Sequence, residues 1–333
     1  MRVALVGPPQ SGKTTLFAAV AEAGGSDVDT HRPDRPHAAV VKVPDERLQW
    51  VSELFGSRKT TPAELEFVDV PGLDLSDEAG RHHARTHWPA MRQSDMLVFV
   101  VRAFEDPSVP PYRSRVDPAA DVRELLEEML FADLDQVTTR MEKLEAAVKK
   151  PTADRDAELR ELELMKRLSE ALEADKPVSA AVQSETEDKL IRSFAFCSQK
   201  PMLVALNGSE EDLSAGDGDD RVESLPCVRL SAKIEEEIAQ LPAGERTEFL
   251  KDLGLADPAG DRLIRACFRQ MGLVSFFTPS EKETRAVTVP AGTDALTAAG
   301  QVHSDIARGF IRAEVVGFDD LREAGDMKTA RAA

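Results

Sequence analysis

The chain has 333 residues, and since domains commonly hold one to two hundred residues, this length suggests two or three folded units. Acidic residues number 60 against 42 lysines and arginines, and the net charge of −18 works against attraction to a nucleic-acid backbone, so no direct DNA binding is expected. No apolar run is long enough to span a membrane, the N-terminus lacks a signal peptide, and three distant cysteines form no disulfide framework or metal clip. We therefore expect a cytoplasmic protein without membrane contact.

Short apolar runs indicate a series of strands. Residues 2–6 form the first predicted strand and residues 14–20 the first predicted helix, with a Gly/Pro loop between them. Five further runs have the length and composition of buried parallel strands: 39–43, 65–70, 96–101, 202–206 and 228–230. Because helical or loop segments separate these runs, the pattern predicts an α/β fold with a doubly wound sheet.

The segment from Pro118 to about Lys200 is rich in Glu, Leu, Ala, Lys and Arg, which predicts a helical insertion. Steps of four and three, typical of a coiled-coil seam, separate the apolar residues of its first run: Leu130, Leu134, Val137, Met141, Leu144 and Val148. Residues 149–152 interrupt this pattern. A second apolar run follows, with Leu159, Leu162, Met165, Leu168 and Leu172. We expect two antiparallel helices that project from the core, with helices lying across the core as the alternative.

The remaining elements are weaker. Residues 209–223 are acidic with Gly and Ser, which predicts an exposed loop. A helical stretch is expected near residues 244–271. Residues 273–333 have the pattern of a small separate unit, with strands at 285–289 and 313–316 and a helix at 294–307.

The loop after the first strand carries the most specific motif of the chain. Residues 7–14, Gly-Pro-Pro-Gln-Ser-Gly-Lys-Thr, match G-x-x-x-x-G-K-[ST] in full, between a predicted strand and a predicted helix. Backbone N–H groups of such a loop point at phosphate oxygens, and the positive end of the helix favours the same anion. Lys13 should reach the β- and γ-phosphates, and the Thr14 hydroxyl should bind Mg²⁺. The expected phosphate-binding residues are Gly7, Gln10, Ser11, Gly12, Lys13, Thr14 and Thr15.

A second motif, Asp69-Val70-Pro71-Gly72, ends the strand at 65–70 in the form D-x-x-G. Its carboxylate can hold Mg²⁺ through water, and the Gly72 N–H can sense a γ-phosphate. Alone, such a sequence is usually a strand-ending turn, but its place after a P-loop favours the nucleotide role. We expect Lys13, Asp69 and Gly72 to serve catalysis, and Thr14 and Asp69 to hold the metal.

Base recognition is expected after the strand at 202–206. GTPases of this kind carry N-K-x-D there, whereas this chain has Gly208 in place of the lysine and Glu210 in place of the aspartate. The guanine contacts are thereby lost, which favours ATP over GTP; a surface turn that only resembles the motif is the alternative. The expected base-binding residues are Asn207, Gly208, Glu210, Ser231, Ala232 and Lys233.

Together these motifs resemble the YchF subfamily of the Obg-like P-loop proteins over nearly the whole chain. Beyond the P-loop, the resemblance rests on residues 43–48, 66–69, 100–106, 132–134, 200–203 and 231–235, and on two segments specific to the C-terminal TGS module of the family, 275–278 and 303–315. It implies a P-loop domain with a coiled-coil insertion, a TGS module of β-grasp fold, preferential ATP binding and hydrolysis, and association with ribosomes. The expected domains are 1–116 and 200–272 for the nucleotide, 117–199 for the helical insertion, and 273–333 for the TGS-like module.

The sequence departs from the family pattern in three places. The threonine of switch I, a Mg²⁺ ligand in the family, falls at Pro33, and Thr30 could replace it only in a rearranged loop. The glycine-rich switch II maps onto residues 74–83, which keep only Gly80. The chain also stops at Ala333, before the closing strands of a complete TGS module, so the module is expected to be partial or the sequence truncated.

Three histidines in this switch II region allow several interpretations. His82, His83 and His87 could belong to a solvated helix, could position water near the γ-phosphate, or could bind a metal through the pair His83 and His87. The sequence as a whole predicts a Mg²⁺-dependent nucleotide-binding switch protein that hydrolyses ATP slowly. A conventional GTPase and a non-hydrolysing adaptor for a ribosome or protein partner are the alternatives.

Overall fold

The computed structural model describes residues 1–24, 26, 35–150, 154–210 and 221–332. Thr30 and Pro33, the interruption at 151–152 and most of the acidic loop lie outside the described residues. The chain forms two compact units, Met1–Ala39 with Glu66–Gly260 and Val40–Leu65 with Asp261–Ala333. This division differs from the predicted boundaries because residues 40–65 group with the C-terminal part. No helix of the described ranges is long and apolar enough to cross a membrane.

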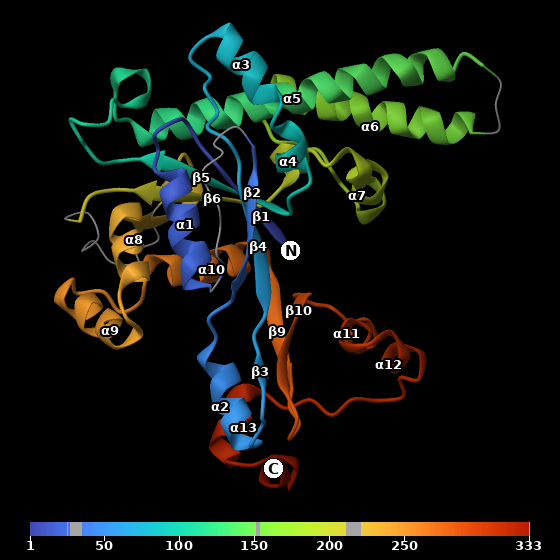
Figure 1. Ribbon diagram of the computed structural model, residues 1–333. Coiled ribbons are helices and arrows are strands. Elements are labelled where there is room, and N and C mark those ends of the chain that lie inside the picture. Colours follow the sequence, from blue (N-terminus) through green and yellow to red (C-terminus); the bar gives the residue numbers. More distant parts are fainter. Residues whose placement is uncertain (25, 27–34, 151–153, 211–220, 333) are drawn as a thin grey trace. The chain divides into compact units, whose positions relative to one another are not determined.

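The first unit is built on a seven-stranded sheet of order β2-β4-β1-β5-β6-β8-β7 (Figure 1). Its strands are β1 (Arg2–Val6), β2 (His37–Lys42), β4 (Glu64–Asp69), β5 (Met96–Arg102), β6 (Met202–Asn207), β7 (Arg221–Val222) and β8 (Leu225–Leu230). The neighbours from β4 through β1, β5 and β6 to β8 pair in parallel, and β7 pairs antiparallel with β8. The predicted doubly wound α/β fold is therefore confirmed.

The central strands are buried on both faces, as their continuous apolar runs predicted: every residue of β5 and β6 is buried. The prediction of a buried strand at 39–43 is wrong, because β2 alternates buried and exposed residues. As the outermost strand of the sheet, β2 has one neighbouring strand and one solvated face.

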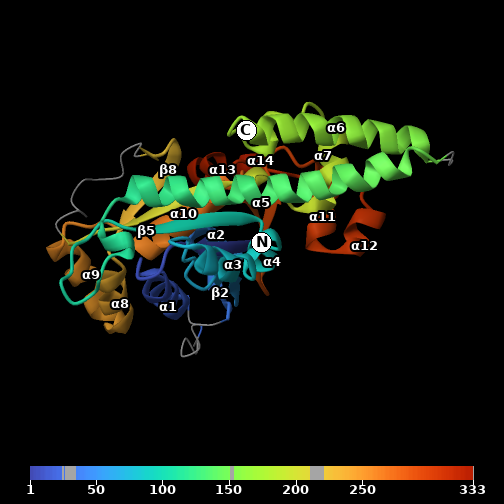
Figure 2. The same ribbon diagram turned by 90° about the horizontal axis from the view of Figure 1, so that it is seen from above.

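Helices on the two sides of the sheet position the loops. They are α1 (Lys13–Ala23), α3 (Glu78–Arg85), α4 (Trp88–Arg92), α5 (Pro118–Ala147), α8 (Ala232–Gln240) and α9 (Ala243–Asp252). The next helix along the chain, α10 (Ala259–Gln270), belongs almost wholly to the second unit. Alternate residues of the strands, such as Ala4 and Phe99, share one core cluster with Val122, Leu125 and Met129 of α5. In Figure 2, α1 and α5 lie on opposite sides of β5.

The predicted helical insertion is present, and its second long helix is α6 (Arg155–Glu173). Figures 1 and 2 show α5 and α6 side by side, and we call this pair, from Leu130 to Glu173, the arm. All six apolar residues predicted for the first seam belong to one cluster between α5, α6 and the short helix α7 (Glu185–Ile191). The first half of α5 lies on the sheet, however, so the arm projects only from its second half.

One residue of the second apolar run lies outside the buried face of α6. Leu159 is 37% exposed, whereas Leu164, which the run did not include, is buried. Repeated steps of three residues fall short of a full helical turn, and two such steps place Leu159 about 120° around the helix from Met165. The buried stripe of α6 therefore passes beside Leu159.

The second unit holds helix α2 (Glu46–Leu54) and a three-stranded sheet of order β3-β10-β9. In this sheet β10 (Thr284–Pro290) pairs antiparallel with β9 (Leu273–Thr278) and parallel with β3 (Thr60–Thr61). This pairing explains why residues 40–65 group with the C-terminal part. Four helices follow: α11 (Ala295–Val302), α12 (Ser304–Arg308), α13 (Phe318–Ala324) and α14 (Met327–Ala332). The β-grasp assignment of this unit stays a prediction.

Two predictions for this unit need correction. The helix expected at 294–307 is divided into α11 and α12, because His303 between them has extended backbone angles (φ −164°, ψ 139°). The strand expected at 313–316 is absent, since residues 309–317 contain no helix or strand. Its β-branched residues lack a neighbouring strand, and Ile311 and Val315 are 91% and 87% exposed.

Candidate functional site

The loop between β1 and α1 has a backbone that its glycines make possible. A Cβ atom at Gly7 would lie 2.2 Å from the carbonyl oxygen of Val100, and one at Gly12 would lie 2.1 Å from Nδ2 of Asn207. Gly12 also has φ 85°, in the left-handed region, and it precedes the first residue of α1. Only glycine therefore allows the loop to pass this close to β5 at position 7 and to β6 at position 12.

This loop lines a cavity of ≈ 370 Å³ together with the segment after β4. The lining residues are Pro8, Pro9, Gln10, Ser11, Gly12, Lys13, Thr14, Thr15, Arg35, His37, Asp69, Pro71 and Gly72. The fold therefore brings together all the predicted phosphate-binding and metal-binding residues except Gly7, which does not line the cavity. Arg35 and His37 are additional lining residues that no motif in the sequence indicated.

Lys13, Thr14 and Asp69 meet in this cavity. Lys13 Nζ lies 2.9 Å from Oδ1 of Asp69, and the Thr14 hydroxyl donates a 2.8 Å hydrogen bond to Oδ2 of the same carboxylate. The side chains of the ion pair are only 6% and 5% exposed. Ser11 Oγ is also buried and has no hydrogen-bond partner among the described residues. The cavity thus combines an ammonium group, two hydroxyls and a carboxylate.

The α1 helix adds a favourable field for an anion. Its N-cap, Gly12, offers no side-chain hydrogen bond, and its first turn contains no acidic residue. The first N–H groups of a helix lack partners inside the helix and carry the positive end of its dipole. Phosphate oxygens placed at this end of the cavity would satisfy them.

The segment after β4 lies directly against the P-loop. The Leu73 N–H donates to the Gly7 carbonyl oxygen at 3.0 Å. A Cβ atom at Gly72 would come within 3.1 Å of the Cα atom of Pro9. The D-x-x-G segment and the P-loop are therefore in direct backbone contact.

Asn207 connects the P-loop to the loop after β8. Its Nδ2 group donates to the Ser11 carbonyl oxygen and its Oδ1 atom accepts from the Ala232 N–H, both at 2.9 Å. Because both ends of this buried amide are engaged, Asn207 fixes the two loops to each other. Glu210 and Lys233 are exposed and do not line the cavity. Base contacts by Asn207, Gly208, Glu210, Ser231, Ala232 and Lys233 stay predictions.

The three histidines occupy different environments. His82 and His83 are exposed on α3, whereas His87 is buried with its ring 5.2 Å from that of His83. Burial lowers the pKa of His87, and the nearby His83 and Lys13 lower it further. Within the described part of the chain, no three His, Cys, Asp or Glu side chains gather where they could hold a metal ion. His82 and His83 are thus solvated, whereas His87 is buried; a role for any of the three in positioning water or binding a metal stays a prediction.

Comparison with known proteins gives two family models that match different parts of the chain. A family model described as "50S ribosome-binding GTPase" matches residues 2–139, and a model of the C-terminal part of YchF GTPases, described as a "protein of unknown function", matches residues 273–333. The chain is 35% identical to the ribosome-binding ATPase YchF of Bacillus subtilis (strain 168), over 99% of this chain and 92% of that protein.

Other relatives agree with this match. The ribosome-binding ATPase YchF of Escherichia coli O157:H7 is 32% identical, over 97% of this chain and 93% of that protein. Among solved structures, the Schizosaccharomyces pombe YchF GTPase superposes with a TM-score of 0.84 and 26% sequence identity, covering 100% of this chain and 92% of that chain.

Proposed function

The chain belongs to the YchF family, and from this premise we propose that it is a ribosome-associated P-loop ATPase that converts ATP slowly to ADP and phosphate. The observation that carries the proposal is the meeting of Lys13, Thr14 and Asp69 in the P-loop cavity. An ammonium group beside the first turn of a helix suits a triphosphate. In such a site, catalysis consists of positioning water and neutralising phosphate charge.

Lys13 has a partner that it must exchange when nucleotide binds. In this structure its ammonium group is paired with Asp69 in a buried setting. A β- or γ-phosphate oxygen would replace the carboxylate as its partner, so the buried cation would stay paired throughout. Asp69, released from Lys13, would then be available at the same end of the cavity.

Thr14 and Asp69 fit a magnesium ion. The Thr14 hydroxyl and the Asp69 carboxylate supply the hard oxygen ligands that Mg²⁺ prefers, and the hydroxyl already lies 2.8 Å from Oδ2 of that carboxylate. We propose that these two residues would hold Mg²⁺, which would supply positive charge to offset that of the phosphates. Gly72, whose backbone lies against Pro9, would report the γ-phosphate through its N–H.

ATP is the proposed nucleotide and GTP the alternative. Gly208 and Glu210 stand where a guanine-specific protein needs a lysine and an aspartate, and Glu210 is exposed. A site that lacks those contacts has no penalty against adenine. A competition titration in which GTP displaces bound ATP as well as ATP itself would favour the conventional GTPase.

A ribosome is the proposed partner, because the relatives are named ribosome-binding ATPases. The net charge of −18 implies that contact with RNA would need a local basic surface rather than long-range attraction. Either the large subunit or the intact ribosome would serve, and such a partner would place the protein in the cytoplasm. The C-terminal unit is proposed to be a TGS-like module of this machinery.

The test is the variant Lys13→Ala, with ATP binding measured by titration calorimetry in the presence of Mg²⁺. Loss of the ammonium group should weaken binding by about 100-fold or more, since charge-assisted hydrogen bonds to phosphate are strong and the site is buried. Lys176→Ala, at an exposed lysine of the same unit, is the matched control and should bind normally. Unchanged ATP affinity in the Lys13 variant would contradict the assignment.

A second measurement distinguishes the ATPase from a non-hydrolysing adaptor. Phosphate release from ATP is followed with and without ribosomes, for the wild-type chain and for Lys13→Ala. Release that depends on Lys13 supports the enzyme. Tight ATP binding with no release in either condition would favour the adaptor.

A further inference from the structure

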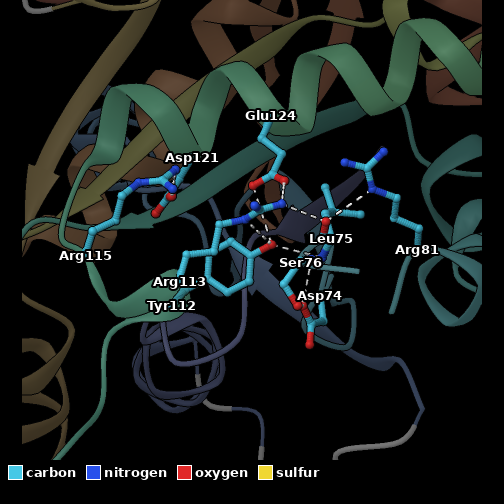
Figure 3. A network of polar contacts seen from close by, with 9 residues as sticks. All are labelled: Asp74, Leu75, Ser76, Arg81, Tyr112, Arg113, Arg115, Asp121 and Glu124. Carbon is cyan, nitrogen blue, oxygen red and sulfur yellow. Dashed lines mark hydrogen bonds and ion pairs between the residues drawn. The ribbon is translucent and has the colours of Figure 1, made fainter. Parts of the chain in front are cut away.

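The segment after Gly72 is held by a pair of residues outside the nucleotide site. The Leu75 N–H donates to the Tyr112 hydroxyl at 2.9 Å, and its carbonyl oxygen accepts from the Arg113 guanidinium at 2.8 Å (Figure 3). Arg81 of α3 donates to the same carbonyl oxygen at 3.2 Å. Side chains therefore satisfy both the N–H and the carbonyl group of Leu75. Tyr112 and Arg113 supply two of these three side-chain partners, and Arg81 supplies the third.

Tyr112 and Arg113 are fastened on their other side to α5. The Arg113 guanidinium forms an ion pair with Glu124, and the Tyr112 hydroxyl lies 3.4 Å from the second oxygen of that carboxylate. Glu124 lies in the second turn of α5 and its side chain is only 16% exposed. Figure 3 shows these two residues lying between Leu75 and Glu124.

The backbone of this connection is strained. Arg113 and Ser114 have φ 52° and φ 55°, in the left-handed region that non-glycine residues rarely occupy. Such conformations cost free energy and persist only where surrounding contacts hold them in place. Two backbone hydrogen bonds, Ser114 N–H to the Pro111 oxygen and Arg115 N–H to the Tyr112 oxygen, hold the turn together with the side-chain contacts to Leu75 and Glu124.

The helix that receives these contacts also builds the arm. Val122, Leu125 and Met129, in the first half of α5, pack in the core of the sheet together with Leu73 and Leu75. Further along the helix, Val137 and Leu144 pack against α6 in the arm. Helix α5 runs for 30 residues without an interruption, so the contacts at its root and the packing of the arm belong to one element.

Helix α3 reaches α5 at a second point. Arg85, in the last turn of α3, lies 4.0 Å from the buried carboxylate of Glu128. Glu124 and Glu128 are one helical turn apart, so both contacts meet the same face of α5. A movement of residues 73–85 would therefore act on this helix at two successive turns.

We propose that Tyr112 and Arg113 are positioning residues that fasten the segment after Gly72 to the root of the arm, and that they couple the nucleotide state of the P-loop site to the position of the arm. This inference rests on the proposed function, because it requires that nucleotide bind at the P-loop. When phosphate draws Gly72 and Leu73, the movement reaches Leu75 and then Glu124 through these two side chains. Coupling of this kind is reciprocal, so a partner that holds the arm changes ATP affinity by the same factor.

The test measures amide hydrogen exchange along residues 118–147, with and without ATP and Mg²⁺, in the full chain. Two variants break the connection: Arg113→Ala removes the guanidinium, and Tyr112→Phe removes only the hydroxyl that accepts from Leu75. The matched control is Arg123→Ala. Arg123 also lies on α5 and forms an ion pair, with Glu223, but its side chain is 57% exposed and, within the described part of the chain, makes no hydrogen bond or ion pair with Leu75, Tyr112 or Arg113. ATP affinity of each protein is measured separately by calorimetry.

ATP should change exchange rates in α5 by about fivefold or more in the wild-type chain and in Arg123→Ala, the lower end of ordinary allosteric coupling. In Arg113→Ala and Tyr112→Phe the change should fall below about twofold, while ATP still binds. A merely structural role would raise exchange equally with and without ATP, and so would leave the response to ATP intact. If Arg113→Ala does not fold, Tyr112→Phe decides, since it preserves the ring and the ion pair.

Two results would overturn the proposal. Either both variants keep the wild-type response to ATP, or the wild-type chain binds ATP with no change in α5. Failure of the underlying function gives a different result, because the wild-type chain would then show no ATP binding in the calorimeter.

Discussion

Lys13 and Asp69 form a buried ion pair where the sequence predicts a phosphate and a metal ion. Removal of one member of a buried pair leaves an uncompensated charge and commonly costs about 3–5 kcal/mol of unfolding free energy. The Thr14 hydroxyl, which also donates to Asp69, offsets part of that cost. Each charge of the pair therefore depends on the other, and the loss of either one alone is expected to destabilise the fold.

We expect Lys13→Met and Asp69→Asn each to lower the unfolding free energy, by about 3 kcal/mol for the lysine variant. The double variant should lose less than the sum, because neither charge is left alone. Urea denaturation of the four proteins measures this coupling. Strict additivity would show that the two side chains do not stabilise each other.

Asp121, at the start of α5, predicts a pH dependence. Burial is the main cause that raises the pKa of its carboxyl group to about 6. Nearby Arg115 and Arg113 lower this pKa, whereas the acidic groups of Glu124 and Asp117 raise it. Figure 3 shows its ion pair with Arg115, at 3.3 Å. Between the ordinary aspartate pKa of 3.8 and the raised pKa of about 6, the folded chain holds a proton that the unfolded chain releases. The contribution of Asp121 to stability therefore falls as pH rises through this window.

Asp121→Asn should remove this effect. Above about pH 7 the variant should be more stable than the wild-type chain by up to about 3 kcal/mol, from about two pKa units at 1.36 kcal/mol each. Near pH 4 the two proteins should differ little, since Asp121 in the folded chain is then protonated and, like asparagine, uncharged. Urea denaturation at the two pH values measures the difference, and equal differences at both would contradict the argument.

At the scale of elements, the arm depends on apolar packing between α5 and α6. Leu168 is fully buried in this cluster, whereas Leu159 of the same helix is 37% exposed. Leu168→Ala should therefore cost about 2–5 kcal/mol, and the matched control Leu159→Ala less than about 1 kcal/mol. Hydrogen exchange of the arm measures both values. Equal losses would mean that the stripe of α6 does not face α5.

Elements could be predicted where the local residue pattern alone limits the backbone to one structure. The P-loop is one example, because glycine at 7 and 12 and the strand and helix on either side leave few other structures for the backbone. The buried strands β5 and β6 are others, since their apolar runs suit only the interior of a sheet. In the site, the meeting of Lys13, Thr14 and Asp69 followed from the order of the two motifs.

Contacts between distant segments could not be predicted in the same way. The bonds from Tyr112 and Arg113 to Leu75 join segments 37 and 38 residues apart and need left-handed backbone at Arg113, which no residue type there signals. Arg35 and His37 line the cavity because the fold brings the start of β2 next to the P-loop, and no motif in the sequence indicates that contact. The strand predicted at 313–316 failed for a related reason, since β propensity is expressed only beside a partner strand.

At the scale of the whole molecule, nucleotide should stabilise the first unit by mass action. A ligand at 100 times its dissociation constant adds about 2.7 kcal/mol to the folded state. We expect ATP with Mg²⁺ to raise the unfolding temperature of the wild-type chain more than GTP does, and to leave that of Lys13→Ala unchanged. Thermal unfolding followed by calorimetry measures both. An equal rise with GTP would favour the conventional GTPase.

The second unit is made of two segments that are far apart in the chain. Ser57 and Thr284 share a hydrogen bond of 2.7 Å across 227 residues, and α2 packs on β10. At about 5–20 residues per second, translation delivers β10 roughly 10–45 seconds after α2 has been made. During synthesis α2, with its apolar residues Leu48 and Val51, is therefore made well before β10, on which it packs in the folded chain. We therefore expect the second unit to complete its fold only after most of the chain has been synthesised.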